Sequence, residues 1–216
     1  MATRRSPRLD KKQAVETALR LLNEVGLDGL SLRAIAKELD VQAPALYWHF
    51  KNKQDLLDEM ATEMYRRMVA RGRPAPDADW RERLLEANRG LRAALLDYRD
   101  GAKVFSGTRF TGTEHAERME AELAALVGAG FTLPQAVRAT TTTYLFTLGF
   151  VTEEQGVQPL PGERREGFDV AERAARMAAF PLAAAAGADL FQDYDAGFEE
   201  GLRLVVEGIE ARYRTA

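Results

Sequence analysis

The chain has 216 residues, of which 46% are hydrophobic and 29% charged, so it is long and apolar enough to bury a substantial core. It contains no cysteine, which excludes a disulfide framework and a thiolate metal site. The net charge of −3 counts against a protein that binds nucleic acid over its whole surface.

The charge is unevenly distributed along the chain. Residues 1–53 hold ten Lys and Arg against six Asp and Glu, whereas residues 54–216 hold 20 against 27. The basic N-terminus is followed by no apolar stretch, so it is not expected to be a secretory signal, and no apolar run reaches the length of a membrane span. We therefore expect a cytoplasmic protein without a membrane partner. Its N-terminal segment is expected to bind a polyanion, unless the basic residues gather there by chance.

Helical periodicity dominates the chain, and no stretch alternates apolar and polar residues as a strand would. Stretches rich in Gly, Pro and charged residues predict a loop at 72–77 and a longer, more mobile loop at 155–167. The predicted fold class is therefore all-α, with a DNA-binding domain at 1–53, a connecting helix at 54–71 and an effector and dimerisation domain at 72–216. The predicted helices cover residues 11–25, 32–39, 44–50, 54–71, 80–98, 113–128, 134–153, 170–186 and 191–213.

The boundaries of the first helices rest on local signals. Asp10 is a plausible N-cap of the first helix and Gly26 a plausible stop. Ser31 caps the second helix, and Pro44 suits the first turn of the third because proline lacks the N–H that would be unpaired there. Two short helices joined by a tight turn, behind a stabilising first helix, are typical of a helix-turn-helix.

The third helix has the properties of one that reads DNA. Ala43 and Ala45 are small and would allow close approach to the major groove. Leu46, together with Trp48 or Phe50, would anchor the helix to the core. A plain three-helix bundle with an aromatic core fits the same pattern, so periodicity alone leaves both interpretations open.

Longer segments carry a family resemblance. Residues 30–41, 44–53 and 56–57, including the run LYWHFKNK, resemble the DNA-binding domain of the TetR family of transcriptional regulators. Residues 99–104, 107–109 and 146–149 resemble the effector domain of the family's tetracycline-binding members. The resemblance covers most of the chain and is weakest near 155–167.

The resemblance implies a set of DNA contacts. Arg33 is the best candidate for a guanine, because its guanidinium matches O6 and N7. Leu32, Ala43 and Ala45 replace polar or hydroxyl residues of the tetracycline-binding members, so their operator cannot be assumed for this chain, and these three positions can offer only apolar contact, for instance to thymine methyls. The predicted DNA-binding set is Arg33, Gln42, Ala43, Pro44, Ala45, Tyr47, Trp48, His49 and Lys53, with Tyr47, His49 and Lys53 on phosphates.

The resemblance also implies an effector site and departs from the family within it. Tetracycline-binding members hold the drug as a magnesium chelate through histidines and an asparagine. Phe105 takes the place of the metal-binding histidine, and it offers magnesium no ligand. Val69 and Ala87 replace the second histidine and the asparagine. The predicted effector-binding set is Val69, Ala87, Leu91, Phe105, Thr108, Arg109, Phe110, Glu122, Tyr144 and Glu153.

This largely apolar lining predicts a sizeable apolar or polycyclic inducer, held without metal or cofactor, rather than magnesium-tetracycline. The alternative is that these residues are ordinary core and that no ligand enters. The second of the two histidines in the chain, His115, is expected to be a solvated surface residue.

The expected function is that of a homodimeric repressor that binds a palindromic double-stranded DNA operator and is released by a small-molecule inducer. The predicted dimer interface combines residues 136–153 and 191–213 of both chains. No nucleophile–base pair, HExxH motif or glycine-rich phosphate loop indicates an enzyme. The alternatives are an activator, or a helical small-molecule carrier or enzyme with a vestigial DNA-binding head.

Overall fold

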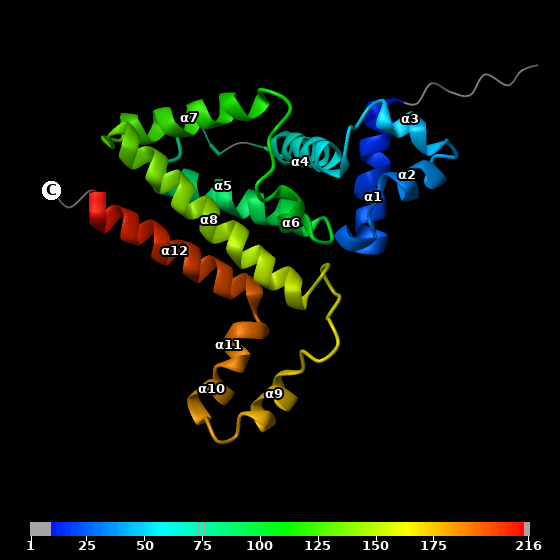
Figure 1. The fold of residues 1–216 in the computed structure, drawn as a ribbon. Helices are drawn as coiled ribbons and strands as arrows, with labels where there is room; N and C mark the ends of the chain where they lie inside the picture. The colour runs from blue at the N-terminus through cyan, green and yellow to red at the C-terminus, as the bar shows by residue number, and fades with distance from the viewer. Residues whose placement is uncertain (1–9, 73, 76, 214–216) are drawn as a thin grey trace, which may run out of the picture.

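The computed structural model describes residues 10–72, 74–75 and 77–213, and every regular element in these ranges is an α-helix. The all-α prediction is confirmed. Three helices form a head at one end of the molecule, shown in blue in Figure 1, and α4 leads from it into the body. These elements are α1 (Lys11–Gly29), α2 (Leu32–Glu38), α3 (Ala43–Tyr47) and α4 (Lys53–Ala70).

Local capping explains where the helices of the head begin. The Asp10 carboxylate accepts a hydrogen bond from the Lys12 amide, and the Ser31 hydroxyl accepts one from Ala34. Pro44 lies in the first turn of α3, as expected. Gly26 has a φ of 68°, which kinks α1 without ending it, so the prediction of a stop there located the break but missed the final turn to Gly29.

The body is built around α8 (Leu133–Val157), which packs against α5 (Trp80–Leu96), α7 (Glu114–Gly128) and α12 (Tyr194–Tyr213). In Figure 1, α8 and α12 run side by side along the body. The short α6 (Gly101–Phe105) joins α5 to the loop that leads into α7. Among the described residues no helix is both long and apolar enough to cross a bilayer.

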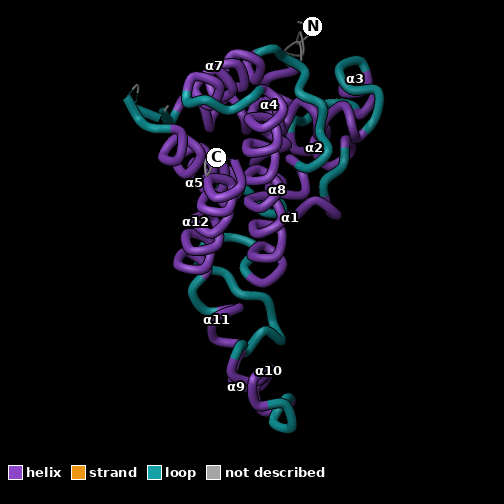
Figure 2. Tube along the Cα trace, turned by 90° about the vertical axis from the view of Figure 1, so that its left-hand side faces the viewer, coloured by secondary structure: helices purple, strands orange, loops and turns teal. Residues whose placement is uncertain are grey.

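The C-terminal half differs from the predicted helices in two places. The single helix expected at 170–186 is two short ones, α9 (Val170–Arg176) and α10 (Pro181–Ala185), and a further short helix, α11 (Gly187–Phe191), precedes α12. Figure 2 shows them as a narrow extension beyond the ends of α8 and α12. The helix expected to end at residue 153 continues to Val157, because the Gln155 amide is buried and bonds to three backbone groups at the α5–α6 turn.

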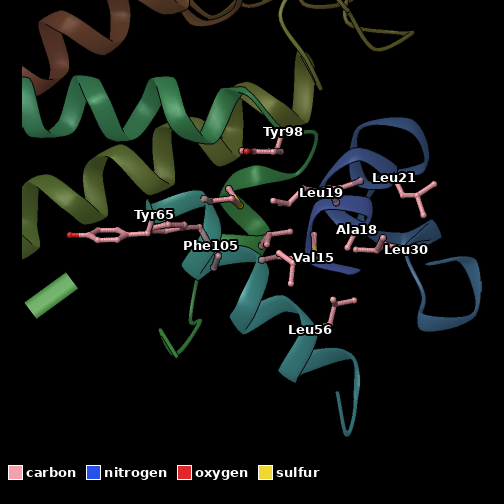
Figure 3. Close-up of a cluster of buried hydrophobic side chains, with 14 of the residues drawn as sticks. Val15, Ala18, Leu19, Leu21, Leu30, Leu56, Tyr65, Tyr98 and Phe105 are labelled. Carbon is pink, nitrogen blue, oxygen red and sulfur yellow. The ribbon is translucent and has the colours of Figure 1, made fainter. Parts of the chain in front are cut away.

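One apolar core runs from the head into the body. Val15 and Leu19 of α1 belong to one buried cluster with Leu56 and Tyr65 of α4 and Phe105 of α6 (Figure 3). The same cluster includes Leu148 and Val151 of α8. The division proposed at residue 53 coincides with the start of α4, but the buried cluster continues across it. A second cluster joins α5, α7, α8 and α12 around Trp80 and Phe131.

Candidate functional sites

The head presents an exposed face on α2 and α3. Asp40, with a φ of 51°, makes the tight turn between the two helices. Leu46 and Phe50 are fully buried and anchor α3 to the head, whereas Trp48 is 90% exposed and Tyr47 51% exposed. The aromatic anchor is therefore Phe50, and Trp48 points outward. An indole of this exposure in a protein rich in apolar core residues is available to a partner.

The nine residues of the predicted DNA-binding set lie on α2, at the N-cap and along α3, in the turn after α3 and at the first residue of α4. Lys53 differs from the others because its ammonium donates a hydrogen bond of 2.7 Å to the Leu27 carbonyl at the end of α1. Two of its three N–H donors remain for a phosphate. Exposed members of the set are Arg33, Gln42, Pro44, Tyr47, Trp48 and His49, while Ala43, Ala45 and Lys53 are half-buried.

A cavity of about 250 Å³ lies in the body between α4, α5, α6, α7 and α8. Aromatic rings form one wall: Phe110 lies 5.0 Å from Tyr65 and 5.4 Å from Phe105, measured between ring centroids. Six members of the predicted effector set line this cavity, namely Ala87, Leu91, Phe105, Phe110, Glu122 and Tyr144.

The other four members of the predicted effector set do not line the cavity. Val69 packs against the apolar core, and the cavity meets Met68 instead. The Thr108 hydroxyl donates to the Val104 carbonyl within α6. Arg109 and Glu153 are exposed.

His115 was expected on the solvated surface, and that expectation is wrong. Its ring lies in the cavity wall, 5.2 Å from the ring of Phe110, and its Nδ1 is buried without a hydrogen-bond partner. Arg118 and Glu122 lie three and seven residues further on and also line the cavity. This spacing places all three on one face of α7, a pattern that was visible in the sequence.

The polar groups of the cavity differ in how far they are satisfied. The Asn88 side chain is fully engaged, since it donates to the Leu84 carbonyl and accepts from the Thr147 hydroxyl. By contrast, Oε2 of Glu122 is buried without a hydrogen-bond partner. Burial raises the pKa of Glu122, an effect that Arg118 and Arg83 oppose and Glu86 reinforces.

The loop after α6 ties the cavity to the connecting helix. The Arg109 amide donates to the Asp58 carboxylate at 3.3 Å, and the Thr111 amide donates to the Thr62 hydroxyl at 3.0 Å. Asp58 and Thr62 are both buried on α4, whose first residue follows the turn after α3. Phe110 lies between Arg109 and Thr111 in the sequence and lines the cavity, so the two hydrogen bonds tether this part of the cavity wall to α4.

The residues of the cavity do not fit a magnesium site. Among the described residues that line it, the one histidine is His115 and the one acid is Glu122, and their backbones are about 10 Å apart on one helix. Magnesium requires a near-octahedral set of oxygen ligands at about 2 Å. No group of three or more metal-binding side chains occurs within residues 10–72, 74–75 and 77–213.

Comparison with known proteins matches both parts of the chain to family models. Residues 14–60 match the "Bacterial regulatory proteins, tetR family" model, and residues 73–213 match "Tetracyclin repressor-like, C-terminal domain". The class A tetracycline repressor protein of transposon 1721, from Escherichia coli, is 42% identical over 95% of this chain and 92% of its own length.

Two solved structures are similar to this chain over more than nine-tenths of its length. A possible TetR family transcriptional regulator from Streptomyces coelicolor superposes with a TM-score of 0.82 at 40% identity, covering 94% of this chain and all of that one. The class A repressor in complex with 5a,6-anhydrotetracycline and magnesium superposes with a TM-score of 0.67 at 36% identity, covering 95% of this chain and all of that one.

Proposed function

Because the chain belongs to the TetR family of bacterial regulatory proteins, we propose that it is a homodimeric repressor whose head binds a palindromic operator and whose cavity binds an inducer. Members of this family are regulators and not enzymes. The observation that supports inducer control best is the pair of tethers from the α6–α7 loop to Asp58 and Thr62 on α4. Through them, the inducer would favour one position of α4 and the operator another, so that binding of one weakens binding of the other.

Operator binding is assigned to the exposed face of α2 and α3. Arg33 is exposed near the start of α2, where its guanidinium can bind a guanine in the major groove. Tyr47, His49 and the free donors of Lys53 would hold phosphates, which fix the register of the head on the duplex. The outward-facing Trp48 adds apolar contact next to them.

We expect Arg33→Ala to weaken operator binding by about 1–3 kcal/mol and to relax the preference at one base pair. Trp48→Ala should weaken binding without changing the free energy of unfolding, whereas Leu46→Ala should cost about 2–5 kcal/mol of stability because Leu46 is fully buried. Gel shifts with an operator selected from genomic fragments, combined with urea denaturation, measure both quantities.

Lys53→Ala tests the phosphate assignment. It should weaken binding on all sequences and flatten the dependence on salt, since one phosphate contact is lost. Exposed Lys12, on the first turn of α1 and outside the set, provides a control whose alanine variant should keep the parent affinity. Parent-like binding by the variants of Arg33, Trp48 and Lys53 together would exclude this face as the DNA-binding surface.

The inducer is proposed to bind without magnesium. Phe105 supplies no metal ligand, and no group of three or more His, Asp or Glu side chains that could hold an ion occurs among the described residues. The apolar wall of Leu91, Phe105 and Phe110 instead favours a polycyclic molecule.

Calorimetry should therefore show weak binding of anhydrotetracycline that magnesium does not strengthen. Release of the operator by a polycyclic inducer should be unaffected by EDTA and should be lost in Phe105→Ala. Submicromolar, magnesium-dependent binding of a tetracycline would refute this part of the proposal.

A further inference from the structure

The cavity has two chemically different sides. The sides from α4, α5, α6 and α8 are dominated by apolar and aromatic groups, among them Tyr65, Leu91 and Phe105. The α7 side carries His115, Arg118 and Glu122. A ligand that fills this space therefore meets apolar surface on one side and a row of polar groups on the other.

Two atoms of that row lack a hydrogen bond. Nδ1 of His115 and Oε2 of Glu122 are buried without a partner, whereas the amide of Asn88 in the same cavity bonds at both ends. Buried polar groups in folded proteins are nearly always paired, and leaving one unpaired is unfavourable. Both residues line the cavity that we assign to the inducer, so a bound inducer can supply the missing hydrogen-bond partners.

The spacing of the two groups sets the length of that partner. Seven residues along an α-helix are two turns, so the backbones of His115 and Glu122 are about 10 Å apart and on the same face. A molecule that reaches both must therefore be elongated, of about the length of three fused aromatic rings.

The charges around Glu122 indicate which group faces it. A carboxylate accepts hydrogen bonds, so the ligand must donate one there. Arg118 lies on the same face of α7, between Glu122 and His115, and its positive charge offsets part of the carboxylate's charge. A neutral donor such as an aromatic amine or phenol is therefore favoured over a cation.

Resting on the proposed function, we propose that the inducer is an elongated, flat, uncharged molecule with a hydrogen-bond donor for Glu122 at one end and a second hydrogen-bonding group for His115 at the other. The remainder of the molecule is apolar and lies against the aromatic wall. This defines the inducer class more narrowly than an apolar polycycle does.

Four fluorescent tricyclic probes test the proposal on the full-length protein. Anthracene has no donor, 2-aminoanthracene has one, 2,6-diaminoanthracene has one at each end, and 9-aminoacridine carries a positive charge. We expect 2-aminoanthracene to bind about tenfold more tightly than anthracene, the diamine to bind more tightly still, and the cation to gain nothing over the neutral amine.

Matched variants assign each end of the probe. Glu122→Leu should abolish the preference for 2-aminoanthracene over anthracene, with Glu122→Met in its place if the leucine variant does not fold. Glu120→Leu, on the exposed side of α7 and outside the cavity wall, should retain the preference. His115→Phe should remove only the advantage of the diamine over the monoamine.

The remaining outcomes separate this proposal from the one on which it rests. Equal affinity of the parent for anthracene and the amines would overturn the inferred donor and leave the cavity as an apolar inducer site. Tightest binding of 9-aminoacridine would overturn the uncharged class. Binding of none of the four would overturn both the inference and the assignment of the cavity, whereas the expected pattern in a protein that binds no DNA would overturn only the regulatory function.

Discussion

Glu122 is the acid of the cavity wall, and burial raises its pKa above the usual value for a glutamate, near 4.5. The folded protein therefore binds this proton more tightly than the unfolded chain does. The stability that the group contributes is fully present below the unfolded pKa and is lost as the pH rises through the folded pKa. In the absence of ligand, this carboxyl group destabilises the protein near neutral pH.

We expect Glu122→Gln, which imitates the protonated side chain, to be more stable than the parent at pH 8 and to lose that advantage toward pH 4. Urea denaturation across this range measures the difference in free energy of unfolding. Glu120→Gln removes an exposed carboxylate from the same helix and should show no such trend. Parallel curves for the Glu122→Gln variant and the parent would mean that Glu122 titrates as a solvated group.

At the scale of single residues, the sequence predicts the chemical character of a side chain better than whether that side chain points into the core or toward solvent. The third helix has only five residues, too few for periodicity to distinguish Trp48 from Phe50 as the anchor. A single histidine gives no indication of burial, whereas the spacing of His115 from Glu122 places both residues on one helix face. The sequence predicted a largely apolar lining that includes Phe105 and Phe110, and the structure places both rings in the cavity wall, 5.4 Å apart.

At the scale of elements, a buried ion pair fixes α5 to α8. The Arg92 guanidinium bonds both carboxylate oxygens of Glu154, at 2.9 and 2.6 Å, and the two side chains are only 12% and 5% exposed. Arg92 also lies over the rings of Phe150 and Phe198, which brings α12 into the same contact. Because α5 and α8 form two sides of the cavity, this pair helps to hold its shape.

Glu154→Ala should destabilise the protein by about 3 kcal/mol, the lower end of the cost of breaking a buried pair, because Arg92 keeps only its 2.7 Å bond to the exposed carboxylate of Asp195. Urea denaturation measures the loss. The double variant Arg92→Met with Glu154→Leu should recover most of it, since it buries no charge. An equally large loss in the double variant would show that packing, and not the unpaired charge, accounts for the effect.

The elements that the sequence failed to predict are those fixed by tertiary contacts. Five-residue α6 follows a left-handed residue, Asp100, whose carboxylate accepts from the Leu27 amide of the head. Nothing in a local pattern specifies that contact. The predicted helix at 170–186 failed because Pro181 begins a new helix, and proline disfavours helical backbone in the residue before it. Long amphipathic helices such as α1, α5 and α12 were predicted within a few residues.

At the scale of the whole molecule, α8 and α12 leave an apolar face uncovered. Leu133, Val137 and Leu145 of α8 are each about half exposed, and so is Leu204 of α12. The first three lie at multiples of four residues and therefore share one side of α8. This face supports the proposed four-helix dimer interface, and palindromic operators require such a two-fold dimer.

We expect Leu145→Glu with Leu204→Glu to convert the dimer into folded monomers and to abolish operator binding, because both charges would enter the interface. Sedimentation should change from about twice 24.0 kDa to the single-chain mass. Val25→Glu, at an apolar position of similar exposure on the head, is the control that should stay dimeric. Leu202 and Val206 do not serve this test, since both are buried in their own chain.

The apolar core that extends without a break from α1 through α4 into α6 and α8 restricts how this protein can be recombined with its relatives. A chimera joined at residue 53 would set this head's Val15 and Leu19 against a foreign α4, and the reciprocal chimera would set this chain's fully buried Leu56 and Met60 against a foreign head. In both, side chains of mismatched shape would meet in the core. Exchange of operator specificity is therefore expected to succeed by replacing surface residues of α2 and α3, and to fail by transplanting the head as a module.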